Sequence, residues 1–211
     1  MSIRKITKIE VQKKRKNRCN IYLDEEFAFG LDQDILLKFD LYKGRELSDA
    51  DIENILDFEE KKNAKDRALK FLSHRDRSEK EIVDKLKQIG FNREVIDWTL
   101  SELKRMQFID DNKFAISFAN TKMVSKPIGE YLLRRELAAK GIEEEVIEQT
   151  VERVYCENDQ ETIALELAQS RMKRYKNLDA PKAKKRISDF LLRRGFNWDI
   201  TSSVLERLEI D

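Results

Sequence analysis

Apolar residues in the last two thirds of the chain recur in one pattern that appears three times. Each copy has an apolar residue, a leucine four positions later, a glycine four positions after that, and then Phe or Ile. The glycines lie 51 and 54 residues apart, a period that indicates one supersecondary unit used three times. The three copies read Ile82, Leu86, Gly90 and Phe91; Leu133, Leu137, Gly141 and Ile142; and Ile187, Leu191, Gly195 and Phe196.

Each copy is predicted to contain three helices. In the first copy, the apolar stripe over residues 64–72 predicts one helix, and Ser78 followed by Glu81 is a capping box that opens the second. Gly90 should end the second helix in a left-handed conformation, and Asn92 should cap the third. The third helix is expected to bury Val95, Ile96, Thr99, Leu100 and Leu103.

The second and third copies follow the first, with one difference. Ala68 and Ala119 each precede the glycine of their copy by 22 positions, whereas Ala168 precedes Gly195 by 27. The extra residues of the third copy fall around positions 175–181, between clusters of basic residues. Trp98 and Trp198 lie on the third helices and are expected to be partly buried packing residues.

The first 60 residues have a different pattern. Short β-favouring runs at 6–11, 19–23 and 27–31 predict a small antiparallel hairpin or meander. Ser48 with Asp51 predicts a linking helix that starts near Asp49. The expected fold is therefore mainly α: three tandem helix-turn-helix-like repeats in an elongated array after a small β segment. Its expected parts are residues 1–62, with the β segment and linking helix, and repeats at 63–108, 109–156 and 157–211.

Charge is segregated along the chain although the net charge is only +1. Residues 1–20 hold eight cations against Glu10, and residues 171–194 hold ten, including Lys176, against Asp179 and Asp189. Such density favours contacts to phosphates or to an acidic protein, with little base specificity. The cations expected to contact DNA or a partner are Lys126, Arg134, Arg135, Arg171, Lys173, Arg174, Lys184, Lys185, Arg186, Arg193 and Arg194.

A helix-turn-helix transcription factor that reads duplex DNA with its third helices is the alternative. Acidic residues on those helices argue against it, because carboxylates facing phosphates are repelled. A purely protein-binding helical scaffold is a third hypothesis. The acidic residues are Glu143, Glu144, Glu145, Glu148 and Glu152 in the second repeat, and Asp199, Glu206, Glu209 and Asp211 in the third.

Catalysis has little support in the sequence. Asp110 and Asp111 could be paired catalytic carboxylates, but their place before an apolar stripe favours one capping a helix and the other complementing its dipole. His74 is the only histidine, and the chain lacks a Gly-rich phosphate loop and metal-ligand spacing, so no cofactor or metal is expected. Two cysteines and no apolar run of about 18 residues favour a cytoplasmic protein away from membranes.

Several ordered motifs between about 64 and 208 resemble the RecX regulatory family. The resemblance implies tandem three-helix repeats that lie in the groove of a RecA recombinase filament on single-stranded DNA. It further implies a monomeric, non-enzymatic modulator of recombination, repair and the SOS response, mostly inhibiting RecA ATPase, coprotease and strand exchange, that also contacts single-stranded and duplex DNA through phosphates. The motifs are ALKFLSHRDRSEKEI at 68–82, GF at 90–91, FIDDNKFA at 108–115, KPIG at 126–129 and LAAKG at 137–141.

Overall fold

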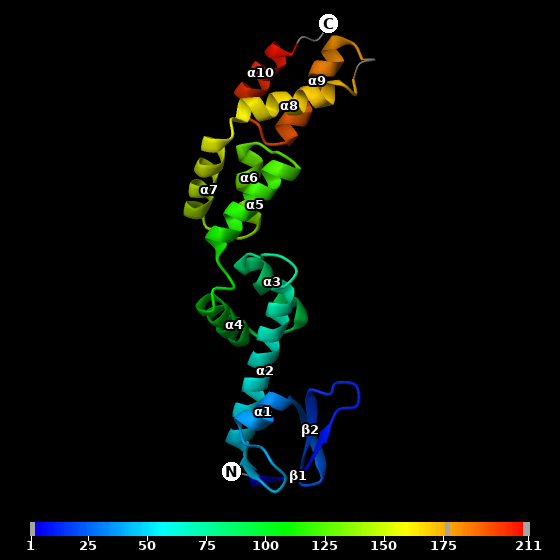
Figure 1. The fold of residues 1–211 in the computed structure, drawn as a ribbon, viewed down its shortest axis with the longest axis vertical. Helices are drawn as coiled ribbons and strands as arrows, with labels where there is room; N and C mark the ends of the chain where they lie inside the picture. Colours follow the sequence, from blue (N-terminus) through cyan, green and yellow to red (C-terminus); the bar gives the residue numbers. More distant parts are fainter. Residues whose placement is uncertain (1–2, 176–177, 209–211) are drawn as a thin grey trace. The chain divides into compact units, whose positions relative to one another are not determined.

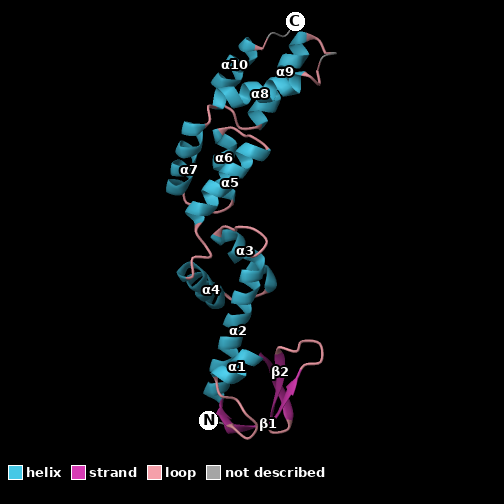
Figure 2. Cartoon of the chain, in the orientation of Figure 1, coloured by secondary structure: helices cyan, strands magenta, loops and turns pink. Residues whose placement is uncertain are grey.

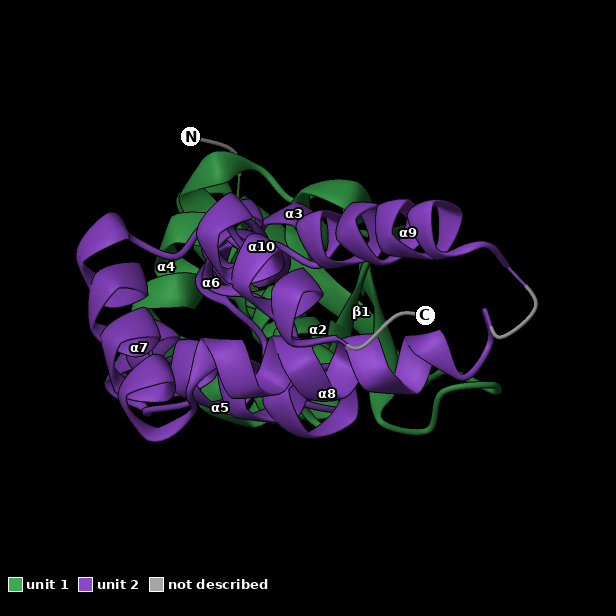
Figure 3. Ribbon diagram, turned by 90° about the horizontal axis from the view of Figure 1, so that it is seen from above, with its two compact units in different colours: residues 1–74, 85–103 green, residues 75–84, 104–211 purple. Residues whose placement is uncertain are grey.

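The computed structural model describes residues 3–175 and 178–208. Within these ranges the chain forms ten helices and one four-stranded sheet (Figures 1 and 2). Figure 3 colours its two compact units, residues 1–74 with 85–103 and residues 75–84 with 104–211. Lys176, Glu209 and Asp211, which contribute to the charge clusters of the sequence, lie outside the described residues.

The N-terminal segment is an antiparallel sheet in the order β3-β2-β1-β4. Its strands are β1 (Ile3–Val11), β2 (Arg18–Leu23), β3 (Glu26–Asp32) and β4 (Glu46–Ser48). The predicted meander is confirmed for β1 to β3, whereas β4 and the short helix α1 (Gln33–Lys38) were not predicted. β4 has only three residues and pairs with the start of β1, so it carries almost no local signal.

Helix α2 (Asp49–Leu72) begins with the predicted capping box, in which the Ser48 side chain accepts from the Asp51 amide. The helix runs unbroken for 24 residues, although the sequence predicted a linking helix and a separate first helix of the repeat. No glycine or proline lies between 49 and 72, so nothing in the sequence interrupts it. Ile52 and Ile55 pack in the core of the sheet.

Helices α3 (Glu79–Ile89) and α4 (Arg93–Arg105) confirm the helix signals of the first repeat. The Ser78 hydroxyl accepts from the Glu81 amide at 3.3 Å, and Asn92 accepts from the Val95 amide at 2.9 Å. Gly90 between the helices has φ = 105°, in the left-handed region that favours glycine. The five residues expected to be buried on the third helix are all buried on α4.

The second unit contains two more three-helix groups, each with its own hydrophobic core. The first group is α5 (Asp111–Ser125), α6 (Glu130–Ala139) and α7 (Glu144–Glu157). The second group is α8 (Gln160–Met172), α9 (Ala180–Arg193) and α10 (Trp198–Arg207). Gly141 and Gly195 have φ of 78° and 85°, as predicted for the glycine turns.

The two tryptophans differ in exposure. Trp98 is half-buried on α4, as predicted. The prediction for Trp198 is wrong, because its side chain is 62% exposed at the first residue of α10, before the helix has turned its apolar face to the core. In the described ranges, every helix is too short or too polar to cross a membrane.

Candidate functional site

The predicted cations divide into those held by the chain itself and those free to meet a ligand. Arg134 belongs to the first group: its guanidinium on α6 donates to Glu130 at 2.9 Å and to both oxygens of Glu148 on α7. The hydrogen bond to Glu148 is the main reason that the pKa of Arg134 is raised above its ordinary value. Its charge is balanced by two carboxylates, so it joins α6 to α7 and offers little to a phosphate.

Arg171 and Arg194 surround one aromatic ring. Their guanidinium carbons lie 4.7 and 5.2 Å from the ring centroid of Phe190 on α9, within the range of cation–π attraction. Arg194 also donates to the carbonyl of Pro127 at 3.0 Å. Both arginines are half-buried, so these two members of the predicted set pack within the second unit.

The remaining cations are exposed, and most of them lie on or beside α9. Arg186 and Arg193 are seven positions apart and share one exposed side of α9, beside the stripe that buries Ile187 and Leu191. Arg186 lies 5.7 Å from the ring centroid of Tyr175. Within the described ranges, none of the following exposed cations forms an ion pair: Lys126, Arg135, Lys173, Arg174, Lys184, Lys185, Arg186 and Arg193. Below, "the α9 surface" means Lys173, Arg174, Lys184, Lys185, Arg186 and Arg193.

The third helices carry the opposite charge. Glu143 before α7 and Glu144, Glu145, Glu148 and Glu152 on it are all exposed, and on α10 Asp199 and Glu206 are exposed. An acidic face of this kind repels a phosphate backbone. The arrangement therefore disfavours the third helices as readers of duplex DNA.

A contact that the sequence analysis missed lies within the second unit and joins the residue before α3 to the end of α6. The Ser78 hydroxyl, directly before α3, donates at 2.7 Å to the carbonyl of Lys140, which ends α6. At the equivalent position 51 residues later, the Gly129 amide donates at 2.8 Å to the carbonyl of Arg194, which ends α9. The same two positions are therefore joined in both places, once through a side-chain hydroxyl and once through a backbone amide.

A second pair of hydrogen bonds repeats in the same joint. The Glu79 amide at the start of α3 donates to Asp111 at 2.9 Å, and the Glu130 amide at the start of α6 donates to Gln160 at 3.2 Å. Asp111 and Gln160 are each the first residue of the next group's first helix. The first bond joins α3 to α5 and the second joins α6 to α8, while the Gly129 and Tyr131 amides bond to the end of α9, so the start of α6 is held against both α8 and α9.

Asp110 and Asp111 are structural. Asp110 caps α5 by accepting from the Lys113 amide at 3.0 Å, and this bond is the main reason that its pKa is lowered. Burial raises the pKa of Asp111, which accepts from Glu79 in the joint. The capping prediction is confirmed for Asp110, and Asp111 has the further role of joining two helix groups.

Glu81 lies at the centre of a charge cluster in the first joint. It accepts from Arg75 at 2.8 and 3.1 Å and from Lys140 at 2.6 Å. Burial raises its pKa, but the bonds from Arg75 and Lys140 outweigh burial and lower the pKa to about 2. Glu81 is therefore ionised at neutral pH and forms ion pairs with both cations beside it.

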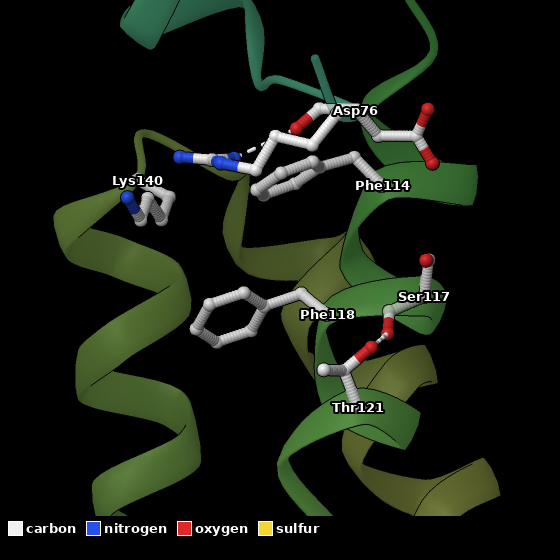
Figure 4. A pocket seen from close by; sticks show the side chains of 7 residues that line it. Asp76, Phe114, Ser117, Phe118, Thr121 and Lys140 are labelled. Atoms are coloured by element: carbon white, nitrogen blue, oxygen red, sulfur yellow. Dashed lines mark hydrogen bonds between the residues drawn. The ribbon is translucent and has the colours of Figure 1, made fainter. Parts of the chain in front are cut away.

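A pocket of about 630 Å³ opens beside this cluster (Figure 4). Phe114 and Phe118 extend into it from α5, with ring centroids 5.9 Å apart, and Figure 4 shows Lys140 across from them. The charges of its two cations, Arg75 and Lys140, are already shared with Glu81. The pocket therefore offers an apolar wall but no unpaired cation to hold an anion.

Comparison with known proteins covers every part of the fold. Residues 4–48 match the regulatory protein RecX N-terminal domain, and residues 64–103, 110–151 and 158–205 match the first, second and third three-helix domains of RecX. The regulatory protein RecX of Bacillus licheniformis and that of Bacillus subtilis are each 37% identical to the chain over 206 residues. The alignments cover 98% of this chain and 78% of those proteins.

Solved structures agree with the sequence relatives. A crystal structure of regulatory protein RecX superposes with a TM-score of 0.73 at 33% identity, covering 96% of this chain and 99% of that one. The crystal structure of RecX from Lactobacillus salivarius gives 0.62 at 25% identity, covering 71% and 97%. From these matches over all four parts, we conclude that the chain belongs to the RecX family of regulatory proteins.

Proposed function

We propose that the chain is a non-enzymatic regulator that binds in the groove of the RecA filament on single-stranded DNA and inhibits its ATPase, coprotease and strand-exchange activities. The observation that carries the proposal is the α9 surface, six exposed cations without ion pairs in the described ranges. A filament on DNA combines protein surface with phosphates, and an unpaired basic face has affinity for both. We place its action in the cytoplasm, as a monomer.

The repeated joint supports the same proposal. It holds α6 and α9 in a fixed register, so Arg135 and the α9 surface act as parts of one linked binding surface. Linked modules raise the effective concentration of the next contact, so contacts that are weak alone add to strong binding. A regulator seated across several recombinase subunits would hinder their relative motion and slow ATP turnover.

The division into residues 1–62, 63–108, 109–156 and 157–211 belongs to this proposal. The first of these boundaries falls inside the continuous helix α2. We therefore expect the N-terminal sheet and the first repeat to move as connected parts during binding, because an unbroken helix has no hinge residue.

The binding test is co-sedimentation of the chain with RecA filaments assembled on single-stranded DNA. Lys184→Glu, Lys185→Glu and Arg186→Glu together should weaken co-sedimentation at least tenfold and reduce its salt dependence, because fewer counterions are released. The matched control reverses three exposed cations elsewhere, Arg67→Glu, Lys70→Glu and Lys87→Glu, and should bind like the parent. Equal weakening by both triple variants would contradict a specific role for the α9 surface.

A further inference from the structure

The N-terminal sheet has an outer face, which points away from its hydrophobic core. Lys8, Tyr22 and Phe27 are cross-strand partners on β1, β2 and β3, and they form a row across the sheet. The neighbouring residues Ile21 and Leu23 point the other way, into the core. A register irregularity in each strand pair places the three row residues beside one another.

Aromatic rings in this row are ordered and reachable. Phe27 is 59% exposed, and its ring meets the Tyr22 ring edge-on with centroids 5.9 Å apart. The Tyr22 hydroxyl donates to Glu10 at 3.2 Å, and the Lys8 ammonium lies 5.1 Å from the Tyr22 centroid. The rings are therefore held in place before any ligand arrives, which lowers the entropy cost of stacking on them.

A basic loop lies at the end of the same face. Lys13, Lys14, Arg15 and Lys16 are consecutive and exposed, and Figure 1 shows the loop between β1 and β2 extending past the strands. Its base is closed by hydrogen bonds from the Gln12 amide to the Arg18 carbonyl at 2.8 Å and from the Arg18 amide to the Arg15 carbonyl at 2.9 Å. No ion pair within the described residues involves these four cations.

Two of the acids near this face form ion pairs, whereas Glu25 and Glu26, directly before Phe27, are exposed. Glu10 pairs with Lys8 at 3.2 Å, and Glu59 pairs with Arg18 at 2.5 Å. Arg15 also lines a hollow with the acids Asp32, Glu59 and Asp66, whereas Lys13, Lys14 and Lys16 do not. From the loop end of β2 at Arg18 to Tyr22 is roughly 13 Å along the strand, so one extended polyanion can meet both the loop and the rings.

We propose that the outer face of the N-terminal sheet, with its basic loop, is a second DNA-binding site that takes single-stranded DNA. Phosphates contact the loop cations, and an unpaired base stacks on Phe27 against Tyr22. Stacked bases inside a duplex do not expose their faces to a side chain, so the aromatic row favours single strands. The choice of DNA over RNA rests on the proposed function, whereas the site itself does not depend on the α9 surface.

The test measures anisotropy of a fluorescein-labelled 20-nucleotide oligothymidylate with the full chain and without recombinase. Phe27→Ala should weaken binding about tenfold with an unchanged salt slope, because a stacked base is lost and no charge is removed. Lys13→Glu, Lys14→Glu and Lys16→Glu together should weaken binding at least tenfold and make the salt slope shallower by about 2, because three phosphate contacts are lost.

Matched controls separate these effects from general ones. Leu37→Ala removes an apolar side chain from α1 that is 84% exposed, and the Arg67, Lys70 and Lys87 triple reversal matches the charge change. Phe27→Trp should keep affinity, and its added fluorescence should be quenched by the oligonucleotide. Equal binding of Phe27→Ala and Leu37→Ala, or displacement by duplex DNA as effective as by single strands, would overturn the proposal. Tighter binding of oligouridylate than of oligothymidylate would overturn the choice of DNA.

The experiments distinguish failure of the second DNA-binding site from failure of the proposed regulation of RecA. If reversing Lys184, Lys185 and Arg186 abolishes oligonucleotide binding and Phe27→Ala leaves it intact, the second site is wrong while filament regulation stands. If Phe27→Ala weakens oligonucleotide binding and the protein leaves RecA unaffected, the second site stands alone.

Discussion

Glu81 determines whether the neighbouring cations Arg75 and Lys140 are available to bind an anion. Only 16% of its side chain is exposed, and three donor groups from Arg75 and Lys140 surround the carboxylate. Because the pKa of Glu81 is lowered to about 2 from an ordinary value of 4.5, its carboxyl group binds a proton less tightly in the folded state than in the unfolded state. The resulting stabilisation is complete above about pH 4.5 and is lost as the pH falls towards 2.

Replacing Glu81 with Gln therefore has a pH-dependent cost. At pH 7 we expect Glu81→Gln to lower the free energy of unfolding by on the order of 2 kcal/mol, and near pH 2 the difference from the parent should vanish. Chemical unfolding of the parent and the variant at several pH values measures the difference in free energy of unfolding at pH 7 and near pH 2. The control is Glu94→Gln, whose side chain is 83% exposed and should change stability little at any pH. An equal loss for Glu81→Gln at pH 7 and pH 2 would contradict the role of the charge.

At the scale of elements, the joint between successive helix groups depends on two glycines in contact. A Cβ on Gly129 would lie 2.4 Å from the carbonyl carbon of Gly195, and a Cβ on Gly195 would lie 2.4 Å from Leu132. Gly129 itself has φ = −80°, which any residue adopts. Its lack of a side chain is therefore required by close approach and not by backbone conformation.

Gly129→Ala should destabilise the chain by about 1–3 kcal/mol through overpacking at this joint. Gly90→Ala is the matched comparison, because Gly90 has φ = 105° but nothing within 4 Å of an added Cβ. It should cost about 1 kcal/mol for the backbone alone. Hydrogen exchange distinguishes the two, because only Gly129→Ala should raise exchange of the Gly129 and Tyr131 amides, which donate across the joint. Unchanged exchange there would show that the contact does not hold the groups together.

The sequence predicted the features that depend on near neighbours. Capping by Ser48, Ser78, Asn92 and Asp110 and the glycine turns each lie within a few residues, so the signal is local. The joint was missed because Ser78 and Lys140 are 62 positions apart. The pairing of Arg134 with Glu148 was missed for a related reason, because it depends on how two helices face each other.

At the scale of the whole molecule, the predicted binding cations fall into two classes according to the side chains around them. Arg134, Arg171 and Arg194 are half-buried against carboxylates or an aromatic ring, whereas Lys184, Lys185 and Arg186 are exposed, although Arg186 lies near the Tyr175 ring. Sequence reasoning found the basic stretch, but it could not sort the members that pack from those that remain free. The sorting predicts that charge reversal of Arg134 acts on stability, while charge reversal of Lys185 acts on binding.

That contrast can be measured with two single variants. Arg134→Glu places a third carboxylate beside Glu130 and Glu148 and should lower the midpoint of thermal unfolding by several degrees. Lys185→Glu should leave the midpoint within about one degree and weaken binding to filaments. Differential scanning calorimetry measures the unfolding midpoint of each variant, and co-sedimentation measures its binding to filaments. A Lys185 variant that melts early and binds normally would reverse the assignment.

The most direct test of the proposed function is the ATPase rate of RecA on single-stranded DNA as this protein is added. Inhibition in the filament groove predicts that the rate falls progressively as the protein approaches stoichiometric amounts. It also predicts that the triple reversal of Lys184, Lys185 and Arg186 requires at least tenfold more protein for the same effect, whereas the triple reversal of Arg67, Lys70 and Lys87 behaves like the parent. An ATPase rate that does not change at stoichiometric protein would contradict the proposed function.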